Sequence, residues 1–300
     1  MASKIEPRTN LHIADKSFPT GYRLYDDLKG ISSGLTIERV KSVMERGGIR
    51  LKGASKGVRI VGCFFTLKAP QTGSNLPGGV EIQGGVSDVL VEGCEASHFC
   101  MVPVPKKYDN GDGFASERGC IGLVFRDCYS HDNSDGGFDN KGEYRLENCR
   151  SERNKRNYRA WDGGVYVDCA SRDPREAHWW FGTGMLDATL VNPTFEGTGH
   201  HLMIDYGKPG QVIAITGGSV DGRPITRVED LRVKKNGKGK NVLVTWAPIA
   251  ETRGFDAGEV LPDGNNDGLV KIGAAWAKKL SLPVGSVLKN IGGTRYEVVS

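Results

Sequence analysis

The stretch YRLENC, residues 144–149, contains the pattern that decides the fold: alternating apolar residues, a small or polar residue, and then a cysteine. The phrase recurs as VRIVGC up to Cys63, VLVEGC up to Cys94, LVFRDC up to Cys128 and, one residue shorter, VYVDC up to Cys169. Successive cysteines of this series lie 31, 34, 21 and 20 residues apart, and the two longer intervals carry inserted loops. The chain is therefore built from a structural repeat.

Each repeat unit has the periodicity of a β-strand with one buried face. Self-similarity at about 20 to 25 residues indicates stacked units that bury their apolar faces against one another. Helical spacing is nearly absent between residues 34 and 225, and the consensus of leucine-rich repeats is missing. The sequence therefore predicts an all-β protein, a right-handed parallel β-helix of about seven to nine rungs.

The repeat also suggests how the chain is divided. Residues 1–33 look irregular, and we expect them to cap the first rung, because the exposed end of a β-helix is an aggregating edge. Residues 34–248 form the predicted β-helix. Residues 249–300 follow the last convincing strand and are expected to form a C-terminal cap segment.

Composition excludes several classes of protein. The formal net charge of +4 is too small to indicate a nucleic-acid partner. No apolar stretch approaches the roughly 18 to 20 residues that span a bilayer, so we expect no membrane partner. The start of the chain, MASKIEPRTN, contains no apolar signal core, so no signal peptide is predicted within this chain. A monomer is expected.

The cysteines predict a buried ladder of thiols. Seven cysteines are an odd number, and five of them occupy equivalent inward positions. Such positions on neighbouring rungs lie roughly 5 Å apart. No CxxC pair occurs, so neither a disulfide framework nor a metal site is expected from these residues.

Three consecutive repeats can be aligned on an aromatic residue: Phe114, Phe138 and Tyr158. If these side chains stack inward, the residue after each of them faces outward. Asp139 and Arg159 each directly follow an aromatic residue, so the two are expected to lie one above the other on the outer surface.

Four aspartates are expected to gather near this point: Asp112, Asp132, Asp135 and Asp139. Each taken alone is better explained as a turn residue, because GDG and SDGG are turn sequences. Together they would repel one another unless a cation is present. Calcium accepts six to eight oxygen ligands in flexible geometry, so the cluster predicts a Ca²⁺ site.

The run NGDGF, followed one repeat later by NSDGGFD, resembles the calcium-dependent pectate lyases of polysaccharide lyase family 9. The resemblance covers roughly residues 79–165. It implies that Asp112, Asp135 and Asp139 bind Ca²⁺ and that the position of the catalytic lysine is taken by Arg159. Gly136 stands where the family has a further aspartate.

The activity implied by this resemblance is β-elimination on a polymer of uronic acids. A base removes the proton at C5, and the glycosidic bond at O4 then breaks. A cation stabilises the charge that develops at the neighbouring carboxylate. Arg159 is the predicted base, although a guanidinium with a pKa above about 12 is a weak one, and it could instead bind the substrate carboxylate. Lys155, Lys141 and Tyr158 are fallback bases.

The resemblance further implies a secreted or periplasmic protein with an acidic polysaccharide as its partner. Aromatic and basic side chains near the cluster are candidates for binding the sugar rings. These candidates are Arg156, Tyr158, Trp161, His178, Trp179 and Trp180. Because neighbouring residues of a strand face opposite ways, at least one of the last two is expected outside.

Other functions remain open on the same scaffold. The differences at Gly136 and Arg159 also fit a glycan-binding or phage tail-type β-helix without catalytic activity. A glycoside hydrolase would use two of Asp112, Asp135 and Asp139 as acid and base. A uronate C5-epimerase would remove the same proton without breaking the chain. The substrate specificity for one polymer is expected to depend on the insertions at residues 68–79, 100–111 and 172–180.

Overall fold

We describe the protein from a computed structural model. It describes residues 12–15, 33–45, 47–72, 76–104, 110–183 and 187–248, together with the backbone of short strand segments at 8–9, 17–18, 24–25, 32, 255–256, 269–271, 287–292 and 295–298. The chain divides into two compact units, Met1–Thr245 and Trp246–Ser300.

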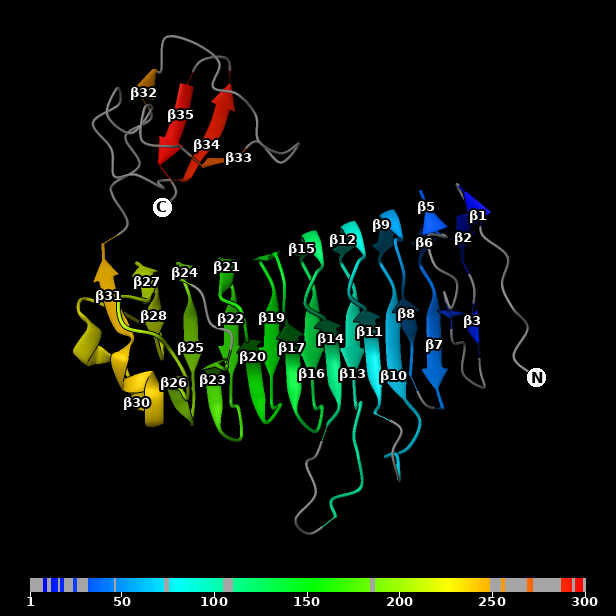
Figure 1. Cartoon of the computed structure of the whole chain (residues 1–300), viewed down its shortest axis with the longest axis horizontal. Helices are drawn as coiled ribbons and strands as arrows, with labels where there is room; N and C mark the ends of the chain where they lie inside the picture. The colour runs from blue at the N-terminus through cyan, green and yellow to red at the C-terminus, as the bar shows by residue number, and fades with distance from the viewer. Residues whose placement is uncertain are drawn as a thin grey trace. The chain divides into compact units, whose positions relative to one another are not determined.

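The first unit is a parallel β-helix, as predicted. Its strands form three long sheets, and each coil of the chain contributes one strand to each sheet in turn (Figure 1). Sheet A contains β1 (Arg8–Thr9), β2 (His12–Ala14), β5 (Ser32–Ser33), β6 (Thr36–Glu38), β9 (Lys56–Val61), β12 (Ser87–Glu92), β15 (Ile121–Arg126), β18 (Tyr144–Glu147), β21 (Gly164–Val167), β24 (Ala188–Val191), β27 (Val212–Thr216) and β31 (Leu243–Ala247).

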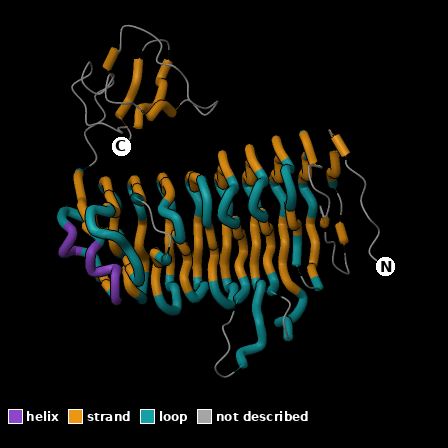
Figure 2. Tube along the Cα trace, viewed as in Figure 1, coloured by secondary structure: helices purple, strands orange, loops and turns teal. Residues whose placement is uncertain are grey.

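The other two sheets complete each coil. Sheet B contains β3 (Ser17–Phe18), β7 (Lys41–Met44), β10 (Phe64–Leu67), β13 (Glu95–Ser97), β16 (Tyr129–His131), β19 (Arg150–Glu152), β22 (Ala170–Arg172), β25 (Thr194–Glu196), β28 (Ser219–Val220) and β29 (Arg223–Pro224). Sheet C contains β4 (Leu24–Tyr25), β8 (Ile49–Leu51), β11 (Gly78–Ile82), β14 (Asp112–Ser116), β17 (Gly136–Asn140), β20 (Arg156–Ala160), β23 (Ala177–Phe181), β26 (His200–Ile204) and β30 (Val233–Lys235). Two short 3₁₀ turns, η1 (Val228–Asp230) and η2 (Gly237–Asn241), lie near β30 (Figure 2).

The corner between sheets A and B explains the repeated phrase. The residue before each ladder cysteine has a left-handed backbone, with φ of 52° at Asp127, 49° at Asn148 and 51° at Asp168. Glycine, asparagine and aspartate tolerate this conformation better than other residues. The small or polar residue of the phrase is therefore the turn that passes the chain from sheet A to sheet B.

The cysteine ladder is confirmed. Each of its five members is 1% exposed, and the described cysteines are all free thiols. Cys94 Sγ accepts a hydrogen bond from the Cys63 amide at 3.4 Å and donates one to the Ile60 carbonyl at 3.4 Å. The thiols thus join successive coils without disulfide bonds.

The predicted aromatic stack runs through the interior along sheet C. Ring centroids lie 5.0 Å apart for Phe114 and Phe138, 5.3 Å for Phe138 and Tyr158, and 4.3 Å for Tyr158 and Trp179. These side chains are fully buried. Stacked rings at these separations stabilise the register of the coils beyond the area they bury.

Both ends of the chain contain short strands. Short strands within residues 1–33 pair with β6, β7 and β8, so they extend the three sheets of the helix. The second unit contains an antiparallel sheet of β32 (Phe255–Asp256), β35 (Arg295–Val298), β34 (Val287–Gly292) and β33 (Leu269–Lys271). Within the described residues, no helix has the length and apolar character needed to cross a membrane.

Candidate functional site

The outward face of sheet C brings the predicted acidic and basic residues together. β17 and β20 pair in parallel so that Asp139 lies opposite Arg159 and Phe138 opposite Tyr158. The aromatic partners point inward, and the two charged residues point outward from adjacent coils. The predicted superposition of Asp139 and Arg159 is therefore confirmed.

The guanidinium of Arg159 lies among three carboxylates. Its Nη1 atom is 2.7 Å from Asp135 Oδ2, 2.8 Å from Asp139 Oδ2 and 3.6 Å from Asp112 Oδ1. Arg159 is only 2% exposed, and Asp135 is fully buried. We call these four residues the Arg159 cluster.

Burial raises the pKa of two of these carboxyl groups. For Asp112, removal from water and then the nearby charge of Asp139 raise the pKa well above its ordinary value, against the opposing effect of Arg159. The pKa of Asp139 is also raised by burial, although the charges of Arg159 and Lys141 oppose this. One guanidinium therefore does not fully offset the cost of burying several carboxylates.

Glycine at position 136 is required by the closeness of this packing. The Gly136 amide donates a hydrogen bond to Asp112 Oδ1 at 2.7 Å. A Cβ atom at this position would lie 2.5 Å from the same oxygen and 3.1 Å from Cδ of Arg159. A larger side chain, such as the further aspartate of the resembled family, would have to displace one of these groups.

The residues of the cluster do not fit a calcium ion in this arrangement. The position between the three carboxylates is filled by the guanidinium of Arg159. Among the described residues, no group of three or more His, Cys, Asp or Glu side chains is arranged to hold a metal ion.

Three members of the Arg159 cluster, Asp112, Asp139 and Arg159, line a groove of about 460 Å³, which we call the sheet C groove. Its lining includes Asp112, Asp139, Lys141, Arg159, Trp161 and Trp180. The indole of Trp161 donates a hydrogen bond to Asp139 Oδ1, and that of Trp180 donates one to Asp205 Oδ2 at 2.7 Å. Trp161 is partly buried and Trp180 is 5% exposed, so Trp161 offers most of the aromatic surface that a sugar ring could contact.

Two of the predicted insertions contribute to the rim. Leu76 and Pro77, from the insertion at 68–79, and Asn110, from the insertion at 100–111, also line the groove. Each insertion comes between a strand of sheet B and the next strand of sheet C, between β10 and β11 and between β13 and β14 (Figure 1).

Most cations of the groove are already paired. Lys141 Nζ lies 2.8 Å from Glu117 Oε1, Arg156 Nε lies 2.8 Å from Glu176 Oε2, and Arg50 pairs with Glu81. Lys141 and Arg156 were predicted as a fallback base and a sugar ligand, and both line the groove as expected. Their roles stay predictions.

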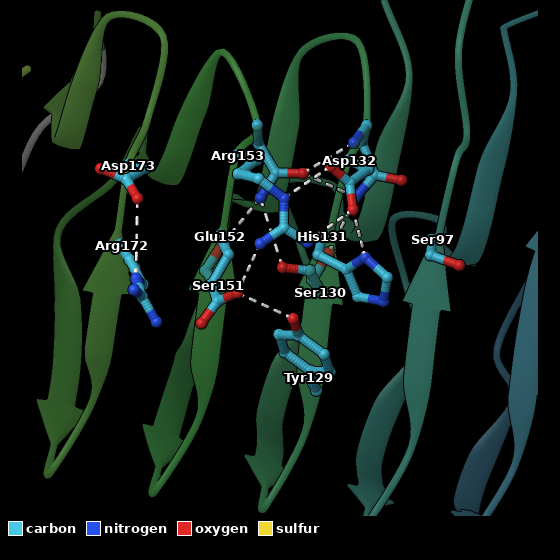
Figure 3. Close-up of polar contacts among 12 residues, drawn as sticks. Ser97, Tyr129, Ser130, His131, Asp132, Ser151, Glu152, Arg153, Arg172 and Asp173 are labelled. Carbon is cyan, nitrogen blue, oxygen red and sulfur yellow. Dashed lines mark hydrogen bonds and ion pairs between the residues drawn. The ribbon is translucent and has the colours of Figure 1, made fainter. Parts of the chain in front are cut away.

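Asp132 is not part of the cluster, and that prediction is wrong. It occupies the corner after β16, with a left-handed φ of 57°, and faces the outer side of sheet B (Figure 3). Its carboxylate accepts hydrogen bonds from Arg153 Nε at 2.8 Å and Nη2 at 2.7 Å, and lies 2.6 Å from His131 Nδ1. The strand alternation used for the prediction does not apply across this corner.

Three predicted sugar ligands are interior residues instead. Tyr158, His178 and Trp179 are fully buried, so none can contact a ligand at the surface. In β20 and β23 two consecutive residues face inward: Asn157 and His178 both hydrogen bond to Ser171 Oγ at 2.8 Å while the next residue joins the aromatic stack. Trp180 then faces the groove, as expected for one member of the tryptophan pair.

Lys155 lies away from the groove. It lines a separate hollow together with Cys100, Ser134 and Arg175. Conversely, sequence reasoning missed Arg50, Glu81 and Glu117, which line the groove. The spacing of the repeats could have identified Glu81. It pairs with Ala115, and Ala115 pairs with Asp139, so Glu81 lies in the same row two coils before Asp139.

Comparisons with known proteins leave the family open. No protein family matches the sequence, and no curated protein matches it. Among solved structures, the chain is similar to the catalytic unit of the thermostable GH87 alpha-1,3-glucanase from Streptomyces thermodiastaticus strain HF3-3, with 11% identity and a TM-score of 0.34. The match covers 80% of this chain and 62% of that one. So low a TM-score supports no conclusion, and the resemblance to family 9 pectate lyases stays a prediction.

Proposed function

We propose that the protein cleaves a polysaccharide bound in the sheet C groove, with Asp112 and Asp139 as its acid and base. The observation that supports this most directly is that both carboxyl groups line the same groove as Trp161 and Trp180. Enzymes that break glycosidic bonds commonly have a pair of carboxyl groups in a cleft that is lined by aromatic side chains.

Hydrolysis is the reaction that these residues support best. A carboxyl group with a raised pKa keeps its proton to a higher pH than an ordinary one and can donate it to the glycosidic oxygen as the bond to the sugar carbon breaks. Asp112 suits this role because burial raises its pKa well above the ordinary range. Asp139 would then accept the proton of the attacking water.

Arg159 is better suited to holding these carboxyl groups than to acting as a base. A guanidinium beside two carboxylates at 2.7 and 2.8 Å is held in its charged form. In this role Arg159 is a positioning residue, which fixes the carboxyl groups by charge-assisted hydrogen bonds.

Elimination on a uronic-acid polymer is the second candidate. It is favoured by the way Asp112, Asp135, Asp139 and Arg159 meet in one cluster, as the resemblance to family 9 implies. A carboxylate of the cluster would then have to remove the C5 proton in place of Arg159. Among the described residues of the groove, Lys141 and Arg156 are paired with Glu117 and Glu176, so a uronate carboxylate would have to compete with these two side chains.

A screen of neutral and acidic polysaccharides separates these reactions. Hydrolysis releases reducing ends without an absorbing product, whereas elimination creates a double bond that absorbs in the ultraviolet. We expect Asp112→Asn and Asp139→Asn to abolish either signal while Asp132→Asn retains it. Binding of a polymer without any product would support the non-catalytic alternative and contradict the proposal.

A further inference from the structure

We propose that Arg159 is a built-in cation that occupies the place of a metal ion, so that the Arg159 cluster is complete without a metal and excludes one. This inference does not depend on which reaction the groove performs. It rests on the position of one guanidinium relative to three carboxylates, and it concerns a role that is independent of proton transfer.

Three carboxylates surround one atom of Arg159, as ligands surround a coordinated metal ion. A single atom, Nη1, contacts oxygens of all three aspartates, which come from β14, β17 and the turn before β17. The half-exposed Arg153 instead reaches its two carboxylates, Asp132 and Glu152, through three separate nitrogen atoms. In the Arg159 cluster the cation lies where the three side chains converge.

The surroundings hold this cation in place. The guanidinium carbon lies 5.2 Å from the ring centroid of Trp161 and 5.3 Å from that of Trp180. Aromatic faces at this distance attract a cation, and more strongly when it is removed from water. Because Arg159 is part of the chain, placing its charge does not require the loss of translational freedom that binding a free ion does.

The oxygens that remain could not satisfy calcium alongside Arg159. Asp112 Oδ1 accepts a hydrogen bond from the Gly136 amide, and Asp139 Oδ1 accepts one from the indole of Trp161. Calcium needs about six to eight oxygen ligands. Gly136 contributes no carboxylate at the position where the resembled family has one.

Terbium luminescence tests the inference without reference to catalysis. Tb³⁺ prefers oxygen ligands as Ca²⁺ does, and a nearby tryptophan sensitises its emission. We expect no sensitised emission from the wild-type protein. Arg159→Ala would leave the three carboxylates beside Trp161 and Trp180, so we expect it to bind Tb³⁺ at least about 100-fold more tightly than wild type.

Two further variants define the site. Arg159→Ala combined with Asp135→Asn should lose the emission, because one of the three carboxylates is removed. Arg118→Ala is the matched control: Arg118 pairs with a single carboxylate, that of Asp162, so its removal should create no site. Excess Ca²⁺ should displace Tb³⁺ from the Arg159 variant and raise its melting temperature, but leave that of wild type unchanged.

Two results would overturn the inference. One is sensitised emission from the wild-type protein that disappears in Asp135→Asn, because a metal would then bind beside Arg159. The other is a folded Arg159→Ala variant that binds no Tb³⁺. If that variant does not fold on its own, the wild-type and Asp135→Asn titrations still decide the first point, and Ca²⁺ is then expected to restore its folding.

Discussion

Arg159 and Arg153 belong to the same coil and show how burial changes one kind of interaction. Arg159 contacts three carboxylates on the outer face of sheet C, and Arg153 contacts Asp132 and Glu152 beside sheet B. The side chain of Arg159 is 3% exposed and that of Arg153 is 47% exposed. The pairing chemistry is the same, but Arg153 and its partner Asp132 reach solvent, and of the second group only Glu152 is buried, whereas all four residues of the Arg159 cluster are buried.

The carboxyl groups respond in opposite directions. Hydrogen bonds from Arg153 lower the pKa of Asp132 to about 2. Burial raises the pKa of Asp112 although Arg159 is close. A neighbouring guanidinium therefore stabilises a carboxylate at the surface, whereas below the surface desolvation outweighs it. Raised pKa values at a groove are typical of sites that transfer protons.

The largest expected effect is on cleavage of the polysaccharide. Asp112→Asn and Asp139→Asn should each lower kcat by about 10²- to 10⁴-fold, because each removes a proton donor or acceptor. Asp132→Asn should leave kcat within about twofold of wild type, since Asp132 pairs with Arg153 and does not line the sheet C groove. Equal losses in all three variants, measured on the polymer found in the screen, would remove the distinction between the clusters.

The two arginines should also differ in their effect on stability. Arg159→Met leaves buried carboxylates without their cation and should lower the free energy of unfolding by about 3 to 5 kcal/mol at pH 7. Arg153→Met should lower it by less than about 1 kcal/mol, because its partner Asp132 is partly exposed to water and the buried Glu152 keeps its ion pair with Arg150. Urea unfolding followed by circular dichroism measures both. Similar losses would mean that burial does not separate the two clusters.

Aromatic residues on the two faces should differ in ligand binding. Trp161→Ala should weaken binding of the polysaccharide by about tenfold, because it removes an aromatic wall of the sheet C groove. Tyr129→Ala removes an aromatic ring from the outer face of sheet B, where it stacks on His131 at 4.4 Å, and should leave binding unchanged. Trp161→Phe keeps an aromatic face and should restore most of the affinity. Isothermal titration of an inactive variant measures these affinities.

The smallest expected effect is on how stability depends on pH. The unfolded chain binds the Asp132 proton between pH 2 and the ordinary pKa of 3.8, so stability rises with pH in that window. Folded Asp112 keeps its proton above pH 3.8 while the unfolded chain loses it, so stability falls as pH rises there.

Single substitutions separate these two contributions. Asp132→Asn should remove a rise of about 1 kcal/mol, reduced by solvent exposure, and Asp112→Asn should remove the fall. Urea unfolding between pH 2 and pH 7 measures both slopes. A slope of the same sign for both residues would contradict the assigned pKa shifts.

The repeat made the fold and much of the site predictable. The cysteine phrase identified the sheets and their inward positions, and the aligned aromatics placed Asp139 above Arg159. Periodicity carries this information because each coil repeats the geometry of its neighbour.

Corners and bends limited the prediction. Asp132 is itself the left-handed corner residue, and His178 and Trp179 are consecutive residues that both face inward, so strand alternation misplaces Asp132 and His178. The position of the Arg159 head group within the acidic cluster depends on side-chain packing in three dimensions. The pattern of charges along the sequence predicted a cation among the three aspartates. It did not predict that this cation is the side chain of Arg159.

A crystal structure of Asp112→Asn with an oligosaccharide of the cleaved polymer tests the central claim most directly. We predict sugar rings packed against Trp161 and Trp180 in the sheet C groove, with a glycosidic oxygen next to residue 112 and Arg159 still among the acidic side chains. An oligosaccharide bound to the outer face of sheet B, with no sugar in the sheet C groove, would contradict it.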